Sequence, residues 1–540
     1  MRLDPAVCER ARQSRDARFD GRFFIGVLTT GVYCRPVCPA RSPLPRNVRF
    51  YPTAAAAAED GLRPCLRCRP ETAPGTSAWA GTSATVARAL RLIAAGALDR
   101  GGVEELADPL GVTPRHLSRL FVQHLGASPK AVAQTRRLHF AKRLIDETRL
   151  PMADVALSSG FKSVRRFNDA FRATYSRSPS ALRSARGREP HEAATVEESP
   201  IALRLAFRPP YDWGGLIEFL GPRAIPRVEE VSRDAYRRTI RVDGQAGLIE
   251  VRPVADRHCV RLEVRQAGPR ALFGIAERIR RLFDLDADSS VIANHLERDP
   301  LLAPVVGRRP GLRVPGAWDG FELGVRAILG QQVSVKGATT LAGRIVEAYG
   351  DPLPAAAGDG LTHLFPTARR LARADLSRIG LPGARAGAIN AFARACAEGR
   401  LGLESGRSFE EIAGRLTGLS GIGRWTAEYV ALRALGDPDA FPSTDLGLVR
   451  AAGFDAGPRG ARRLAERAEA WRPWRAYAAM YLWQLYGKQS ATPRPPRTRR
   501  SQDELRLRRQ PAGPDPDRRQ RKRPEADLVH GGQPRGTTAG

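Results

Sequence analysis

The segment "LSGIGRWTAEYVALRALGDPDAFPSTDLGL" at residues 419–448 decides the fold of the second half of the chain. Gly421-Ile422-Gly423 stands between two stretches whose apolar residues recur at helical spacing. Glycines at such a turn let backbone N–H groups approach a DNA phosphate at the start of the second helix. The segment therefore predicts a helix-hairpin-helix motif in which Gly421 and Gly423 contact DNA, although a single G-x-G is more often an ordinary turn.

An acidic residue, Asp445, follows the hairpin directly after a Phe-Pro break. Residues 200–487 resemble the bacterial 3-methyladenine DNA glycosylases of the AlkA type, in stretches such as "PPYDW", "RLFDLDAD", "RPGLRVPGAWDGFELGVRAILGQQVSV" and "PWRAYAAMYLW". The resemblance implies that Asp445 is the catalytic carboxylate. It also implies a pocket for a flipped-out base, although each of its aromatic residues taken alone is more simply core packing: Phe219, Trp425, Tyr429 and Trp483.

The chemistry expected of this site needs one carboxylate. An N3- or N7-alkylated purine is already cationic, so it leaves without a general acid and produces an oxocarbenium-like sugar that Asp445 would stabilise. Bifunctional relatives carry a lysine where this chain has Trp425, so the enzyme is expected to be monofunctional. No cysteine follows Cys396, so no iron–sulfur cluster is expected. Gln332 stands where the family has an apolar residue that fills the gap left by the flipped base, and Thr444 stands where it has a second acid. The resemblance therefore leaves open how firmly this gap is filled and how fast the base is released.

Four of the seven cysteines are grouped as C-x3-C and C-x2-C in "GVYCRPVCPARSP" and "LRPCLRCRP". In a reducing compartment disulfides are not expected, and the spacing of Cys34, Cys38, Cys65 and Cys68 fits one tetrahedral Zn²⁺. Spacing alone favours a purely structural zinc clip. Several arginines beside the ligands would instead bring DNA phosphate to the site: Arg35, Arg41, Arg63, Arg67 and Arg69.

Residues 1–76 resemble the N-terminal domain of the Ada methylphosphotriester repair proteins, on the stretch "FFIGVLTTGVYCRPVCPARSPLPRNVRFYPTAAAAAEDGLRPCLRCRPE". The resemblance implies that Cys34 accepts a methyl group from an alkylated phosphate while the other three cysteines remain zinc ligands. Zinc would keep the sulfur deprotonated, and methylation would remove one negative charge facing DNA. The Pro-Cys-His-Arg core of the O6-alkylguanine methyltransferases is absent from the chain, so direct repair of that lesion is not expected.

An internal repeat lies between the two regions. "VEELADPLGVTPRHLSRLFVQHLGASP" and "MADVALSSGFKSVRRFNDAFRATYSRSP" each place an alanine four residues before a glycine, then a second apolar helix, then Ser-Pro. This pattern predicts two helix-turn-helix units and resembles the paired units of AraC-type regulators. The recognition helices are expected at about 114–123 and 163–172, with these side chains facing a major groove: Arg115, His116, Arg119, Lys162, Arg165 and Arg166.

The chain as a whole fits a DNA-binding protein. Its 540 residues carry 87 Lys and Arg against 57 Asp and Glu, a net charge of +30 that attracts polyanions. Neither a signal peptide nor a stretch long enough for a membrane helix is evident, so we expect a cytoplasmic protein with no membrane partner.

We therefore expect a multidomain, mostly helical α+β protein. Its parts are an Ada-type zinc domain (1–76), a tandem helix-turn-helix domain (82–185), a small α+β domain (200–312), an all-α helix-hairpin-helix glycosylase domain (313–487) and a disordered basic tail (488–540). The expected partners are damaged duplex DNA, promoter DNA and RNA polymerase, and the expected cofactor is one Zn²⁺. Two alternatives remain open: a transcription activator with a weak or inactive glycosylase half, and a structural DNA-binding protein whose zinc only folds the N-terminus.

Overall fold

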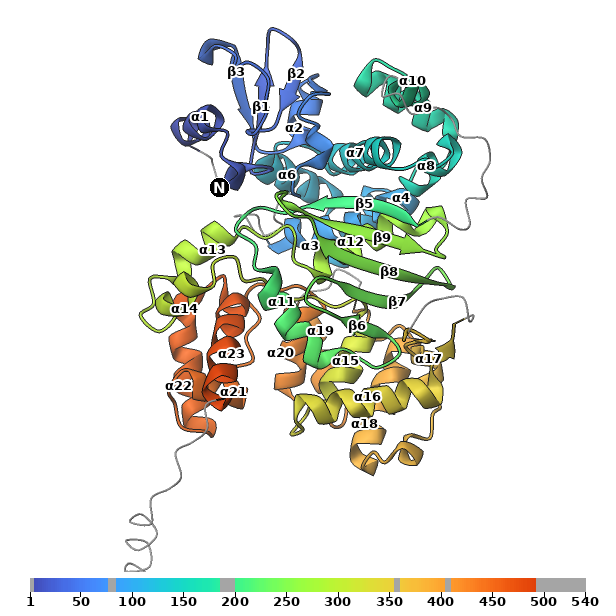
Figure 1. Ribbon diagram of the computed structural model, residues 1–540, viewed down its shortest axis with the longest axis vertical. Helices are drawn as coiled ribbons and strands as arrows, with labels where there is room; N and C mark the ends of the chain where they lie inside the picture. Colours follow the sequence, from blue (N-terminus) through green and yellow to red (C-terminus); the bar gives the residue numbers. More distant parts are fainter. Residues whose placement is uncertain (1–3, 76–83, 185–199, 354–359, 404–408, 492–540) are drawn as a thin grey trace, which may run out of the picture. The chain divides into compact units, whose positions relative to one another are not determined.

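The computed structural model describes residues 4–75, 84–184, 200–353, 360–403 and 409–491. Residues Met1–Gln489 make one compact unit, drawn in Figure 1. The last helix, α23 (Arg475–Ala491), continues past residue 487, where the tail was expected to begin. The rest of that expected tail, from residue 492 on, lies outside the described residues. Within the described ranges, no helix is both long and apolar enough to span a lipid bilayer.

The N-terminal domain is a small sheet with the strand order β3-β1-β2-β4. Helix α2 packs against it and is capped by Thr53, whose Oγ1 accepts a hydrogen bond from Ala56 N at 3.1 Å. Strand β2 ends at Cys34, and β4, parallel to β2, ends just before Cys65, so the sheet brings the two cysteine pairs together. The elements are α1 (Pro5–Ser14), β1 (Phe24–Val27), β2 (Val32–Cys34), β3 (Val48–Tyr51), α2 (Ala54–Glu59) and β4 (Arg63–Pro64).

The helix-turn-helix repeat is present as expected. Ala107 and Ala156 are buried where helices cross, and Gly111 and Gly160 have φ of +69° and +82°, the left-handed conformation that a tight turn requires. The two recognition helices are α6 (Pro114–Leu125) and α9 (Val164–Tyr175). The other helices are α3 (Ala84–Ala94), α4 (Ala97–Arg100), α5 (Val103–Ala107), α7 (Pro129–Glu147), α8 (Met152–Ser158) and α10 (Pro179–Ser184).

The third region is a five-stranded antiparallel sheet with the order β5-β9-β8-β7-β6, accompanied by helices. Apolar side chains alternate along β5 and β9, so that Leu203, Leu205, Val260 and Leu262 enter the core. The elements are β5 (Ile201–Ala206), α11 (Trp213–Leu220), β6 (Glu229–Val231), β7 (Tyr236–Val242), β8 (Gln245–Pro253), β9 (Cys259–Arg265), α12 (Leu272–Leu282), α13 (Ser289–Leu296) and α14 (Ala303–Arg308).

The C-terminal region is helical, apart from the two-residue strands β10 (Asp351–Pro352) and β11 (His363–Leu364), which were not expected in an all-α domain. Its helices are α15 (Gly320–Leu329), α16 (Val335–Tyr349), α17 (Ala368–Leu371), α18 (Gly383–Ala397), α19 (Phe409–Thr417), α20 (Arg424–Arg433), α21 (Leu446–Ala451), α22 (Pro458–Ala468) and α23. Figure 1 shows α21, α22 and α23 as one group and α15, α16 and α18 as another.

Most of the described buried apolar residues of this half belong to two hydrophobic cores. One joins the five-stranded sheet to α21, α22 and α23, and the other joins α15, α16 and α18 to α19. Helix α20 lies along the boundary, because its Ala427 and Val430 belong to the second core while Ala431 and Leu432 belong to the first. Residues from both cores can therefore meet beside α20.

Candidate functional site

Asp445 lies at the boundary of the two cores and caps a helix. Its Oδ1 accepts a hydrogen bond from Leu448 N at 3.0 Å, which makes it the N-cap of α21. The same carboxylate accepts hydrogen bonds from two indoles, Trp425 Nε1 to Oδ2 at 2.9 Å and Trp483 Nε1 to Oδ1 at 3.2 Å. Three donors from three helices thus fix the position and orientation of one partly exposed carboxylate.

The four aromatic residues expected at the base pocket are neighbours. The rings of Trp425 and Tyr429 are stacked, 5.3 Å apart at 15°. Trp483 meets Tyr429 edge to face at 6.1 Å and lies 6.2 Å from Phe219. Phe219 is buried, while the other three keep partial exposure. The structure therefore brings the set together around Asp445, from α11, α20 and α23.

Two arginines that the sequence analysis did not single out stand against this cluster. The guanidinium carbon of Arg223 lies 3.8 Å from the centroid of the Phe219 ring, and that of Arg433 lies 5.0 Å from it. Arg433 Nη1 donates to Tyr429 Oη at 2.9 Å. Burial would raise the pKa of Tyr429, but the charges of Arg433 and Arg223 outweigh burial, and this pKa is lowered. Arg433 follows Tyr429 by four residues on one helix face, a signal that the sequence did contain.

The helix-hairpin-helix has the geometry that its glycines imply. Gly421 has φ of +80°, and a Cβ there would lie 2.7 Å from Cβ of Ala388. Gly423 is the N-cap of α20, whose first N–H groups are therefore open to a partner. Gln331 Nε2 donates to Gly421 O at 3.0 Å, which ties the hairpin to the loop that carries Gln332. Both glycines are exposed beside this loop.

The two departures from the family pattern, Gln332 and Thr444, are exposed side chains. Gln332 has φ of +56° in the turn between α15 and α16, so it projects from a tight loop. Thr444 directly precedes Asp445. Their exposure leaves both residues accessible to a DNA strand that approaches the hairpin.

The second candidate site is the group of four cysteines. The sulfur atoms of Cys34, Cys38, Cys65 and Cys68 all lie within 4.8 Å of one another. Tetrahedral Zn²⁺ with Zn–S bonds of about 2.3 Å needs sulfur pairs about 3.8 Å apart, so these residues fit the ion. By contrast, burial and the nearby Asp4 raise the pKa of Cys8 to about 11, so that residue remains a thiol.

The arginines beside the cysteines fall into two classes, which corrects the expectation that all five face phosphate. Arg41, Arg63 and Arg67 are exposed. Arg35 is ion-paired with Asp20, and Arg69 Nη2 lies 2.6 Å from a carboxylate oxygen of Asp146. Both are partly buried and bind carboxylates instead. Asp20 and Asp146 are distant in sequence, whereas Glu71, whose Oε1 lies 3.2 Å from Arg69 Nε, is a near neighbour.

The side chains predicted for the recognition helices lie on exposed surface. Arg115, Arg119, Lys162, Arg165 and Arg166 are exposed, and His116 is partly buried. The two helices are capped alike: Thr113 Oγ1 accepts from His116 N, and Ser163 Oγ accepts from Arg166 N, both at 3.2 Å. The repeat thus extends to the caps, because Arg115 and Arg165 each stand two residues after the cap of their helix.

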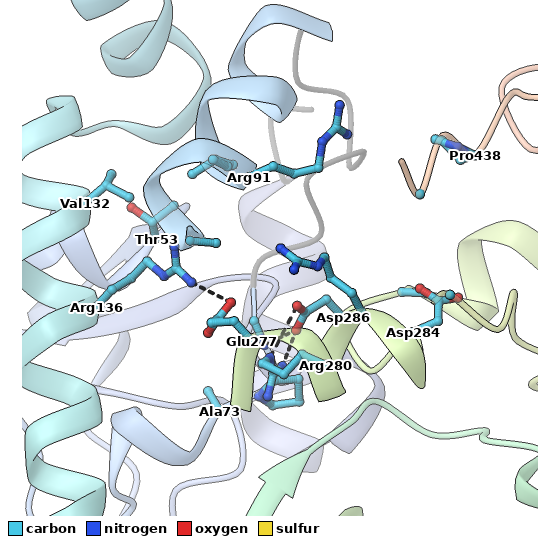
Figure 2. A pocket seen from close by; sticks show the side chains of 18 of the residues that line it. Thr53, Ala73, Arg91, Val132, Arg136, Glu277, Arg280, Asp284, Asp286 and Pro438 are labelled. Carbon is cyan, nitrogen blue, oxygen red and sulfur yellow. Dashed lines mark hydrogen bonds and ion pairs between the residues drawn. The ribbon is translucent and has the colours of Figure 1, made fainter. Parts of the chain in front are cut away.

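A cavity of about 340 Å³ is lined by residues of the zinc domain, the helix-turn-helix domain and the glycosylase half (Figure 2). Its charged walls are paired: Arg136 Nη2 lies 2.7 Å from Glu277 Oε2, and Arg280 is bound to Asp286. Asp445 and the four aromatic residues, all within the described ranges, are not among its lining residues. The cavity therefore shares Arg433 with the candidate site but contains neither its carboxylate nor its aromatic side chains.

Four family models match the chain in the expected order. They are the metal binding domain of Ada (7–71), a helix-turn-helix domain (106–185), the AlkA N-terminal domain (202–319) and the HhH-GPD superfamily base excision DNA repair protein (325–476). These matches confirm that the chain contains the zinc-binding and glycosylase regions expected from the sequence.

Three curated proteins show how these parts combine. A Mycobacterium tuberculosis protein described as a "probable bifunctional transcriptional activator/DNA repair enzyme AlkA" is 47% identical over 89% of this chain and 97% of its own length. Escherichia coli DNA-3-methyladenine glycosylase 2 is 37% identical over 53% of this chain and 98% of its own. The Escherichia coli bifunctional transcriptional activator/DNA repair enzyme Ada is 41% identical over 24% of this chain and 35% of its own. The chain therefore belongs to the family of bifunctional transcriptional activators and DNA repair enzymes of the AlkA type.

Proposed function

We propose that the C-terminal half is a monofunctional DNA glycosylase that excises N-alkylated purines from duplex DNA. The observation that carries this proposal is the carboxylate of Asp445, fixed by Trp425, Trp483 and the start of α21 at the edge of an aromatic cluster. The hairpin glycines lie at the start of the same helix that carries Trp425 and Tyr429. DNA held by the hairpin would therefore present a flipped base close to the aromatic side chains.

The reaction needs little from the protein beyond this arrangement. Trp425, Tyr429, Trp483 and Phe219 would surround the base, and Asp445 would lie against the sugar whose N-glycosidic bond breaks. The bond electrons leave with the base and neutralise its positive charge. The sugar cation is stabilised by Asp445 until water adds to it and gives up a proton. Trp425 stands where a Schiff-base lysine would be required, which supports hydrolysis without strand cleavage.

The test is release of 3-methyladenine and 7-methylguanine from methylated duplex DNA by the full chain. Wild-type protein should release both, and the Asp445→Asn variant should be slower by a factor of about 10² to 10³. Release at an equal rate by the variant, or no release by wild type, would refute the assignment.

We propose a second activity for the zinc domain, the transfer of one methyl group from a DNA methylphosphotriester to Cys34. Backbone N–H groups donate to the other three sulfurs, from Ala40 to Cys38, from Cys68 to Cys65 and from Arg35 to Cys68. Each such bond withdraws charge from a sulfur and weakens it as a nucleophile. Burial does not single out Cys34, which is 7% exposed against 6% for Cys68. The support is therefore this hydrogen-bond pattern together with the resemblance.

In this transfer the Cys34 sulfur forms a bond to the methyl carbon, and the bond between that carbon and the phosphate oxygen breaks. The phosphodiester leaves with the electron pair, so no proton is moved. The four residues would hold Zn²⁺, which when bound keeps the sulfurs in the thiolate form. Exposed Arg41, Arg63 and Arg67 would attract the DNA backbone. Peptide mapping after reaction should find one methyl group on Cys34, and finding it on Cys38 would overturn the assignment.

We infer that the tandem helix-turn-helix domain couples this modification to transcription. The exposed basic residues of α6 and α9 would bind promoter DNA, and RNA polymerase would be the partner of the activated protein. Loss of a negative charge at the cysteines would strengthen DNA binding. A methylated sample should bind its promoter more tightly than an unmethylated one, whereas a chain that is only an activator would show this effect and release no base.

A further inference from the structure

The fixed position of Arg433 raises the question of what this side chain does beside the aromatic cluster. It is buried, and it makes three hydrogen bonds: Nε to Pro315 O at 2.8 Å, Nη2 to Gly316 O at 2.9 Å and Nη1 to Tyr429 Oη at 2.9 Å. The two carbonyl bonds hold the guanidinium in one orientation. The third bond occupies a lone pair of the Tyr429 hydroxyl.

A tyrosine hydroxyl that accepts a hydrogen bond from a guanidinium must direct its own proton elsewhere. The ring of Tyr429 is stacked on Trp425, with Trp483 at its edge. The Tyr429 O–H group can still direct a hydrogen bond to a partner beside these indoles. The position of Arg433 therefore favours one role for the hydroxyl, that of donor.

The charges around Tyr429 act in the same direction. Arg433 lies on its own helix, Arg223 lies on the turn after α11, and Asp445 lies at the start of α21, where it faces Arg223. Arg223 is held in place because its Nη1 donates to Phe219 O at 2.9 Å while its carbonyl accepts from Arg326 at 2.8 Å. Two fixed cations beside a phenol make its proton more acidic and its hydrogen bond to an acceptor stronger.

We propose that Arg433, supported by Arg223, is a positioning residue that makes the Tyr429 hydroxyl a hydrogen-bond donor to acceptor atoms on the edge of the flipped base. This role rests on the proposed glycosylase function and specifies it further. Stacking by Trp425 and Trp483 does not distinguish bases by the atoms on their edges. A directed O–H group does distinguish them, by the hydrogen-bond acceptors that they carry. Arg433 and Tyr429 would thus contribute to selection among alkylated bases.

The test is the single-turnover rate of 7-methylguanine release by the full chain between pH 6 and pH 10. The donor is lost when Tyr429 ionises, so the wild-type rate should fall at alkaline pH with a midpoint below about 10, the ordinary tyrosine value. The Tyr429→Phe variant should be roughly tenfold slower near neutral pH and lack this alkaline fall.

Variants at Arg433 separate positioning from structural support. Arg433→Gln removes the charge that lowers the phenol pKa, so the alkaline midpoint should rise by about one pH unit. Arg433→Lys keeps the charge and should restore the midpoint toward wild type. Arg344→Lys is the matched control, because Arg344 is an exposed arginine of the same half whose Nη1 donates to a carbonyl, Ile379 O at 3.3 Å. It should leave rate and midpoint unchanged.

A variant that combines Arg433→Gln with Tyr429→Phe distinguishes positioning through Tyr429 from structural support. If Arg433 acts through Tyr429, Arg433→Gln should slow the Tyr429→Phe enzyme by less than twofold. Equal slowing in both backgrounds would show only a structural role for Arg433 and overturn the proposal. A rate that rises with pH in wild type and not in Tyr429→Phe would identify the phenolate as the active form and overturn it as well. Failure of wild type to release any base would instead refute the glycosylase function itself.

Discussion

Replacing Asp445 with asparagine or with alanine separates the chemical role of this residue from its structural role. The carboxylate accepts three hydrogen bonds, one from Leu448 N and two from the indoles of Trp425 and Trp483. Asparagine keeps one acceptor oxygen, which can retain the bonds to Leu448 and Trp483. Its amide nitrogen would face the Trp425 N–H, and because both groups are hydrogen-bond donors, the bond to Trp425 would be lost. Alanine removes all three bonds.

These differences give separate magnitudes for stability and for rate. Asp445→Asn loses one hydrogen bond, which costs about 1 kcal/mol of unfolding free energy. Asp445→Ala loses the helix cap, about 1 kcal/mol, and leaves two partly buried indole donors unpaired, so the total is about 2–4 kcal/mol. Both variants lose the charge that stabilises the sugar cation, and both should be slower by a factor of about 10² to 10³.

Tryptophan fluorescence can follow the stability of this half directly, because six of the seven tryptophans lie between residues 213 and 483. Unfolding midpoints should decrease in the order wild type, Asp445→Asn, Asp445→Ala, while release of 3-methyladenine falls about equally in both variants. If activity instead follows stability, so that Asp445→Asn keeps most of the wild-type rate, then Asp445 acts as a helix cap and the catalytic reasoning is wrong.

Three further results are expected. Gly421→Ala places a Cβ 2.7 Å from that of Ala388 on a backbone with φ of +80°, so affinity for duplex DNA measured by fluorescence anisotropy should fall roughly tenfold, and unchanged affinity would contradict a role for the hairpin. Gln332→Leu should tighten binding to an abasic-site duplex about threefold, because a leucine wedge buries apolar surface in the gap; weaker binding would exclude a wedge at this loop. Reduced wild-type protein should contain about one zinc per chain by elemental analysis, and Cys65→Ala less than about a tenth of that, since metal affinity falls 10- to 100-fold or more when a binding site is disturbed.

Local pattern was sufficient to predict much of the fold. The recognition helices were expected at about 114–123 and 163–172 and are found at Pro114–Leu125 and Val164–Tyr175, because caps, apolar spacing and left-handed glycines are properties of neighbouring residues. The arrangement of Cys34, Cys38, Cys65 and Cys68 was predictable for a related reason, since short spacing and one metal restrict their geometry.

Contacts between distant residues were not predictable in this way. The resemblance grouped Asp445 with the aromatic residues, yet it did not reveal that two indoles donate to the carboxylate. Arg223 follows Phe219 by four residues, so that contact is local, but nothing local marked Arg223 as a neighbour of Tyr429, because this contact depends on how the turn after α11 packs against α20. Arg35 and Arg69 were misread because their partners Asp20 and Asp146 lie elsewhere in the chain, although Arg69 also pairs with the nearby Glu71.

The boundary between the two hydrophobic cores has a consequence for how this half of the protein loses activity. Trp483 and the helix that Asp445 caps are supported by one core, Tyr429 packs against the other, and α20 has buried residues in both. Each core could stay intact while the two shift slightly against one another, and the helices would then survive although the carboxylate and the rings no longer met. Catalysis in this enzyme is therefore a more sensitive indicator of the alignment of its two cores than helix content is.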